Sequence, residues 1–184
     1  MLYLTATATL SDNIKCVYPK DTEEEPAEFC FELVCTDCRE KHDSKVTINR
    51  FEEHEMSGGK GKASFVMKCK FCGKDCSVTL ALNEEYIYSP ECREELMANI
   101  KTKRKKHGIK NIDLGKAVLL SLDCRGCEVI SLDPSNLIFV VELLSGKTME
   151  CSFEDGENEW YDYDEDLGEE VSVTDVIFDI EKGK

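Results

Sequence analysis

The sequence predicts an all-β protein, an antiparallel sandwich or barrel-like fold with one inserted helix. Many short segments alternate apolar with polar residues at the period of a β-strand, and turn residues separate them at short intervals. Only residues 91–106 show clear helical spacing. A chain of 184 residues is long enough for one domain with a substantial core. We therefore expect a single domain over residues 1–184.

The predicted strands follow the alternating segments along the chain. Residues 19–28 contain two prolines and an acidic run, which indicates an exposed loop. Residues 56–62 (MSGGKGK) predict a flexible hairpin loop, because their spacing does not match a phosphate-binding loop. Residues 145–147 (SGK) predict a hairpin turn. The strands are expected at 2–10, 29–35, 46–51, 63–70, 77–83, 117–124, 137–144, 148–153 and 171–178.

A basic helix is predicted at about residues 90–107. Pro90 suits the first turn, the apolar residues Leu96, Met97 and Ile100 follow helical spacing, and Gly108 should end the helix. Lys101–Lys106 make its end strongly basic, as in nucleic-acid-binding or nuclear localisation segments. We favour a solvated helix end that faces the protein's own acidic tail, because the net charge is −15 and residues 150–181 contain 14 acids without Lys or Arg.

The cysteine usage indicates a reducing compartment. There are 11 cysteines, an odd number, and residues 1–10 alternate like a strand where a secretory leader would be continuously apolar. No apolar run approaches the ~20 residues that span a bilayer. We therefore expect a protein of the cytoplasm, the nucleus or both, where clustered cysteines more often hold metal than form disulfides.

Four of these cysteines have the spacing of a zinc site. Cys35 and Cys38 form one Cys-x-x-Cys pair, and Cys69 and Cys72 form a second after thirty residues. Two tight turns of this kind supply the tetrahedron of sulfur that zinc prefers, with bonds of ~2.3 Å. Gly73 follows the second pair and suits a positive φ. The fold prediction therefore includes a zinc ribbon-like arm at about residues 33–83 and one structural zinc.

Other arrangements of the cysteines are less well supported. A redox Cys-x-x-Cys pair normally opens a helix, and both pairs here are followed by strand-like sequence. A third pair, Cys124 and Cys127, lacks a partner pair, and Cys124 ends an apolar strand, so burial in the core is the simpler interpretation. Cys76 could be a spare ligand, although we expect it to be buried in the strand after Cys72. His42 is expected at the surface.

The segment from Gly58 to Cys72 (GGKGKASFVMKCKFC), together with CTDC at 35–38, resembles the eukaryotic CXXC-motif-containing zinc-binding protein family, long described as a domain of unknown function. DCRG at 123–126 and WYDYD at 160–164 extend the resemblance over nearly the whole chain. The resemblance implies an all-β, sandwich-like fold and a zinc held by Cys35, Cys38, Cys69 and Cys72. It implies no established reaction, and neither Cys127 nor the basic helix belongs to the family pattern.

Three functions remain open at this point. The leading one is a zinc-binding, non-enzymatic interaction or adaptor module with a protein partner, since a closed four-thiolate site leaves no position for water or substrate. The first alternative is metal or thiol handling, which needs exchangeable thiols. The second is a nucleic-acid-associated zinc ribbon that uses the basic helix, and the acidic composition disfavours it. Trp160, Tyr161 and Tyr163 lie among acids and suit either a partner surface or a packed C-terminal loop.

Overall fold

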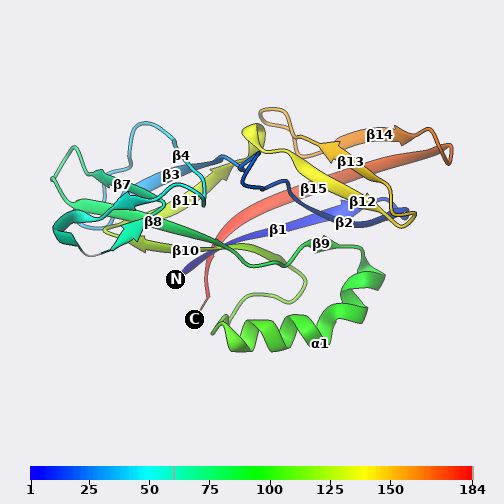
Figure 1. Ribbon diagram of the computed structural model, residues 1–184, viewed down its shortest axis with the longest axis horizontal. Coiled ribbons are helices and arrows are strands. Elements are labelled where there is room, and N and C mark those ends of the chain that lie inside the picture. Colours follow the sequence, from blue (N-terminus) through cyan, green and yellow to red (C-terminus); the bar gives the residue numbers. More distant parts are fainter. Residues whose placement is uncertain (60, 184) are drawn as a thin grey trace.

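The computed structural model describes residues 1–59 and 61–183 and confirms a mostly β fold with one long helix (Figure 1). The helix α1 spans Pro90–Lys106, and the short helical turns η1 and η2 span Ser57–Gly59 and Pro134–Asn136. The strands are β1 (Leu2–Leu10), β2 (Ile14–Pro19), β3 (Phe29–Cys35), β4 (Val46–Ile48), β5 (His54–Glu55), β6 (Lys62–Ala63), β7 (Phe65–Lys68), β8 (Asp75–Leu82), β9 (Ile87–Tyr88), β10 (Ala117–Arg125), β11 (Cys127–Asp133), β12 (Phe139–Leu143), β13 (Thr148–Cys151), β14 (Trp160–Asp164) and β15 (Glu169–Lys182).

The strands form antiparallel sheets around one central pair. The largest sheet has the order β14-β15-β1-β10-β8-β7, and the others have the orders β13-β12-β2-β9, β11-β3-β4 and β5-β6. β1 pairs with β15 from Leu2 opposite Lys182 to Leu10 opposite Val173. Figure 1 shows this pair running through the middle, with β3, β7 and β8 toward one end and β12–β14 toward the other. The first and last strands are therefore next to each other.

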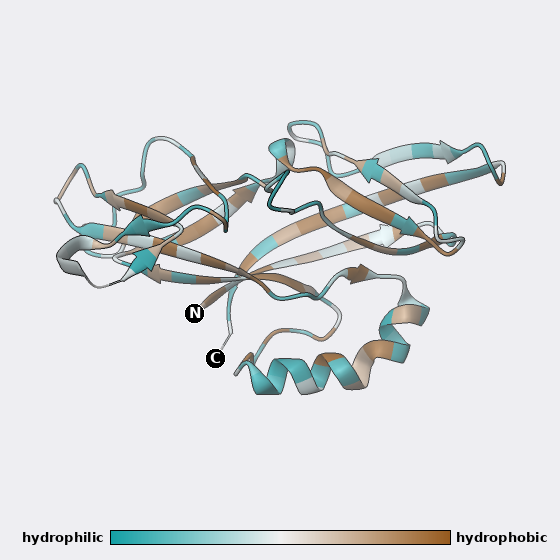
Figure 2. Cartoon of the chain, viewed as in Figure 1, coloured by the Kyte–Doolittle hydropathy of each residue, from teal (hydrophilic) through white to brown (hydrophobic). Residues whose placement is uncertain are grey.

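Aromatic side chains join the sheets in the core. The ring of Phe139 on β12 lies 5.4 Å from the ring of Phe153 and 5.7 Å from that of Phe178 on β15, so the four-stranded sheet packs on the six-stranded one. Phe29 and Phe31 on β3 are fully buried. Burial of each such side chain contributes about 1.5–3 kcal/mol. Figure 2 shows hydrophobic residues concentrated on the strands, whereas the second half of α1 is mainly hydrophilic.

Most predicted strands are present, with some corrected boundaries. The strand predicted at 46–51 ends at Ile48, because the Asn49 side chain accepts hydrogen bonds from the backbone of Phe51 and Glu52 and turns the chain. The strand predicted at 63–70 is divided into β6 and β7 and ends where Cys69 begins a turn. The hairpin turn at 145–147 is confirmed by the bond from the N–H of Leu143 to the carbonyl of Lys147. Sequence reasoning missed β2, β5, β9, β11 and β14.

The helix α1 has the predicted ends, yet its basic residues do not all face solvent. Ser89 caps its start by accepting from the N–H of Cys92, and Gly108 has a φ of 71° just after its end. Arg104 is only 4 % exposed, which corrects the expectation of a fully solvated helix end. Its guanidinium donates to both carboxylate oxygens of Glu85, at 3.0 and 2.9 Å.

Backbone carbonyls complete the attachment of α1. Arg104 also donates to the carbonyls of Ile112, Asp113 and Lys116, in the segment that leads into β10. The ion pairs of the described residues do not join the helix end to the acidic tail, because Lys103 and Arg104 pair with Glu84 and Glu85. Lys116, outside α1, is the basic residue that contacts the tail, with its Nζ 3.5 Å from Asp179 Oδ2 and 3.2 Å from Glu181 Oε1 on β15. A buried ion pair with its hydrogen bonds satisfied thus fixes the helix to the sheet.

In the part of the chain that the structure describes, no helix combines the length and hydropathy that crossing a bilayer requires.

Candidate metal centre

Two turns of the same construction carry the four predicted cysteines. In the first, the N–H of Arg39 donates to the carbonyl of Cys35, and the N–H of Cys35 donates to the carbonyl of Glu40. In the second, the N–H of Gly73 donates to the carbonyl of Cys69, and the N–H of Cys69 donates to that of Lys74. The fifth residue of each turn is left-handed, with φ of 63° at Arg39 and 75° at Gly73. The positive φ expected at Gly73 is confirmed, while that of Arg39 was not foreseen.

The structure brings all four cysteine sulfurs into one cluster. Every pair of Sγ atoms among Cys35, Cys38, Cys69 and Cys72 lies within 4.8 Å. The Sγ atoms of Cys35 and Cys72 are 3.6 Å apart, and those of Cys38 and Cys69 are 3.7 Å apart. A tetrahedral zinc with bonds of ~2.3 Å has S–S edges of about 3.8 Å. The residues present therefore fit a zinc ion in number, ligand type and spacing.

The third Cys-x-x-Cys segment, Cys124–Cys127, packs against the first cysteine turn. It forms the tight turn between β10 and β11, and Cys127 pairs with Cys35 in the ladder of β11 and β3. The carbonyl of Gly126 accepts from the N–H of Thr36 in the first cysteine turn and from the thiol of Cys76, at 3.2 and 3.3 Å. Gly126 has a φ of 75°, and an added Cβ there would lie 2.1 Å from the carbonyl oxygen of Asp75. Only glycine fits this position.

Cys76, Cys124 and Cys127 do not belong to the cluster. Cys76 and Cys127 are buried, as sequence reasoning expected for Cys76, and their thiols donate to the carbonyls of Gly126 and Ser77. Burial raises the pKa of Cys76, and it raises that of Cys124 to about 11. Among the described residues the only group of metal-ligating side chains is the set of four cysteines. His42 instead bonds through Nδ1 to the carbonyl of Ser44.

Backbone N–H groups lower the cost of negative charge at the cluster. In the absence of metal, the N–H groups of Cys38 and Asp37 donate to the Cys35 sulfur and lower its pKa to about 7, against the effect of burial. The N–H of Glu40 donates to Cys38, but burial and the neighbouring thiols raise the pKa of Cys38 to about 12. Zinc displaces such protons when it binds thiols. Zinc binding by the four cysteines would therefore release the protons that the thiols hold.

Comparison with known proteins agrees with this geometry. Residues 2–181 match the family described as "CXXC motif containing zinc binding protein, eukaryotic". The chain belongs to this family. It is 52 % identical over 184 residues to the UPF0587 protein YCR090C of Saccharomyces cerevisiae, covering all of this chain and 99 % of that protein. It is 27 % identical over 144 residues to the human CXXC motif containing zinc binding protein, covering 78 % of this chain and 77 % of that one.

Solved structures show that the fold is shared. The crystal structure of C1orf123 superposes with a TM-score of 0.73 at 24 % identity, over 98 % of both chains. A hypothetical protein from Plasmodium falciparum superposes with a TM-score of 0.71 at 18 % identity, also over 98 % of both chains. The resemblance read from the cysteine turns and from residues 123–126 and 160–164 is thus confirmed. This member of the family is a zinc-binding CXXC protein with a four-cysteine site.

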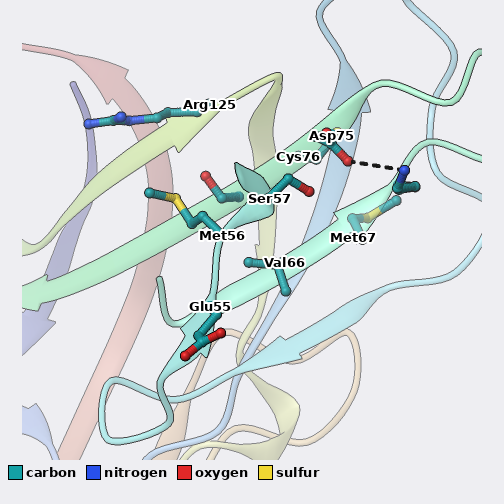
Figure 3. A pocket seen from close by; sticks show the side chains of 10 residues that line it. Glu55, Met56, Ser57, Val66, Met67, Asp75, Cys76 and Arg125 are labelled. Atoms are coloured by element: carbon teal, nitrogen blue, oxygen red, sulfur yellow. Dashed lines mark ion pairs between the residues drawn. The ribbon is translucent and has the colours of Figure 1, made fainter. Parts of the chain in front are cut away.

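A hollow of about 420 Å³ lies beside the cysteine cluster of this family member (Figure 3). Met56 and Ser57, from the glycine-rich loop, line it together with Val66 and Met67 on β7. Cys76 and Met67 line both this hollow and the small space next to Cys35 and Cys69, so they lie between the two. Because its pKa is raised, Cys76 remains a neutral thiol at neutral pH and packs as an apolar group.

Proposed function

We propose that this protein holds one structural zinc ion through Cys35, Cys38, Cys69 and Cys72 and acts as a non-enzymatic interaction module. The observation that carries the proposal is the meeting of four sulfur atoms from two turns of equal construction. Four thiolates fill a tetrahedral zinc, so water and substrate have no coordination position. An ion bound in this way supplies about 10–16 kcal/mol of apparent binding free energy, which holds the arm in its folded form.

The surroundings of the cluster support an interaction role. Phe71, between the second pair of cysteines, is 54 % exposed, and the ammonium of Lys70 lies 5.5 Å from its ring centroid. Exposed aromatic side chains are common anchors of protein interfaces. The zinc then serves to present this turn in a fixed conformation.

Metal analysis of the purified protein tests the zinc proposal. We expect about one zinc per chain in the wild type by native mass spectrometry, because four thiolates fill one tetrahedral site. Cys72→Ser removes an exposed ligand and should lower the zinc content sharply. Cys92→Ser, a half-buried cysteine on α1, is the matched control and should keep the metal. Metal-free wild-type protein with an intact, protected arm would overturn the proposal.

Metal or thiol handling is the second candidate function. It is favoured by the exposure of Cys72 and the partial exposure of Cys38, which leave one side of the cluster accessible. A chelator competition at neutral pH separates the candidates. Release within seconds supports metal transfer, while release over hours supports a structural ion.

Nucleic-acid binding is the weakest candidate. Arg104 is engaged with Glu85, Lys103 lies 3.4 Å from Glu84, and Lys116 lies between two acids of β15. These contacts neutralise part of the basic segment. Retention on a nucleic-acid column that weakens steeply with salt would reinstate this candidate.

A further inference from the structure

A second hollow lies at the end of the molecule away from the cysteine cluster. It is an open depression with a volume of about 750 Å³, lined by residues of three turns, at 11–13, 143–145 and 164–170. Figure 1 shows these turns converging where β1, β12 and β14 end. We call this hollow the acidic cup. The N–H of Leu144 donates to the carbonyl of Asn13 at 2.8 Å, and Asn13 Nδ2 donates to Glu169 at 3.2 Å. These bonds hold the three turns together.

Asp164, at the end of β14, is the unusual residue of the cup. It lines the hollow, yet it is only 1 % exposed. Its Oδ1 accepts from Lys147 Nζ at 2.9 Å and from the N–H of Asp166 at 3.1 Å. Its Oδ2 is buried and has no hydrogen-bond partner. A buried carboxylate oxygen without a donor is unfavourable, so a small opening of the turn at 164–170 that admits a donor would be compensated by the new hydrogen bond.

The rest of the cup has the chemistry of a site for a cation with an apolar stem. Asp12, Glu169 and Glu170 add three exposed carboxylates, and none of the described residues that line the cup is basic. Leu144 and Leu167 also line it and are 56 % and 58 % exposed. Long basic side chains combine a charged head with an aliphatic stem, and they cover such apolar surface while the head reaches a carboxylate.

We propose that the acidic cup receives an arginine side chain from a basic segment of a protein partner. A guanidinium carries five donors in a planar fork. It can pair with a rim carboxylate and, once the turn at 164–170 opens, with Asp164 Oδ2 as well, which the point charge of lysine does less well. The density of carboxylates in the cup supplies the charge complementarity. This inference extends the interaction role proposed above, but it does not depend on the metal.

The test is an NMR titration of the full-length protein with N-acetyl-arginine amide. We expect shifts of the amides in the three turns and saturable binding. The citrulline analogue has the same shape without the charge and should not bind. Glu169→Gln with Glu170→Gln should weaken arginine binding about tenfold, since close carboxylates are lost. Glu23→Gln with Glu24→Gln changes the net charge equally in an exposed loop and should have almost no effect.

A further variant separates the cup from general attraction. Lys147→Ala removes the cation that now pairs with Asp164, so arginine should bind several-fold more tightly. Equal binding of citrulline, an equal loss in both double variants, or weaker binding by Lys147→Ala would overturn the proposal. The zinc content is measured on every sample. Normal zinc without arginine binding rejects the cup alone, whereas absent zinc with arginine binding rejects only the metal proposal.

Discussion

The cysteine arm and the helix α1 are both attached to the sheets by a small charged cluster, but the two clusters differ in kind. At the cysteine arm, residues 33–83, four sulfur atoms come together from two turns 30 residues apart, and under the proposed function a zinc ion holds them. The helix is held by the buried ion pair of Arg104 and Glu85, which forms without a metal ion. The arm should therefore fold only when metal is bound, whereas the helix should fold whenever the sheet does.

The largest expected effect is that of Cys69→Ser. Loss of one buried ligand should abolish zinc binding and remove most of the ~10–16 kcal/mol that the ion supplies. Hydrogen exchange should then show loss of protection in residues 33–83 and retained protection in α1. Cys124→Ser, in the third Cys-x-x-Cys pair, is the control and should keep zinc. If α1 loses protection together with the arm, the two attachments are not independent.

Arg104→Met should come next, with a loss of about 3 kcal/mol in the free energy of unfolding. It removes two close hydrogen bonds from the buried Glu85 carboxylate, which still accepts from the Val118 N–H and lies 3.8 Å from the guanidinium of Arg93. Urea denaturation measures this loss, and the zinc content should not change. Lys103→Met is the matched control on the same helix. Its partner Glu84 is exposed, so the change should be about 0–1 kcal/mol. Comparable losses in the two variants would contradict the importance of the buried pair.

Gly126→Ala tests the support behind the cysteine cluster. A Cβ at this position meets the backbone of Asp75, and the φ of 75° strains any other residue. We expect a loss of about 2–4 kcal/mol and weaker zinc binding. Gly146→Ala also has a positive φ but open space around it, so it should cost only about 1 kcal/mol. An unchanged zinc affinity in Gly126→Ala would show that the Cys124–Cys127 segment does not stabilise the cysteine cluster.

The smallest effect concerns a partly exposed ion pair that ties the arm to β11. Lys45 Nζ lies 2.8 Å from Asp133 Oδ2, and hydrogen bonds from Lys45 and then Ser135 lower the pKa of Asp133 to about 2. A depressed folded-state pKa contributes stability above the unfolded pKa of ~3.9, and this stability is lost as the pH falls toward 2. Asp133→Asn should therefore cost about 2 kcal/mol at pH 6 and almost nothing at pH 2. A difference that does not vary with pH would assign the effect to packing.

The sequence allowed the meeting of the four cysteines to be predicted far better than the attachment of the helix. Cys-x-x-Cys spacing is a local signal whose chemistry fixes its geometry, so two such pairs identify their own contact. Arg104 and Glu85 are 19 residues apart in a segment with many charges, and nothing local separates the buried arginine from the lysines beside it. The missed strands have similar causes. β9 has only two residues, and β14 reads as an acidic stretch because its outward side chains are exposed.

The role of the third cysteine pair could not be predicted from the sequence, because it depends on tertiary contacts. Its spacing matches the two other pairs, but it is the bend that carries the chain from β10 in the main sheet to β11 in the three-stranded sheet, with Gly126 against the first turn and Asp75. The positive φ of Gly126 is foreseeable for a tight turn, whereas its contact with a segment 50 residues earlier is not. The burial of Asp164 Oδ2 without a partner could not be predicted from the sequence either, because it depends on Lys147 bonding the other oxygen, Oδ1.

The pairing of β1 with β15 has a consequence for biosynthesis. Leu2 lies opposite Lys182, so the middle of the main sheet joins residues separated by nearly the whole chain. While the ribosome is still translating, β1 lacks one of its two neighbours and leaves an edge that other chains can pair with. The cysteine turns need only residues 35–74 and can capture metal earlier. Closure of the central pair is thus a late and slow event, and a nascent chain should be most prone to aggregation just before its last strand emerges.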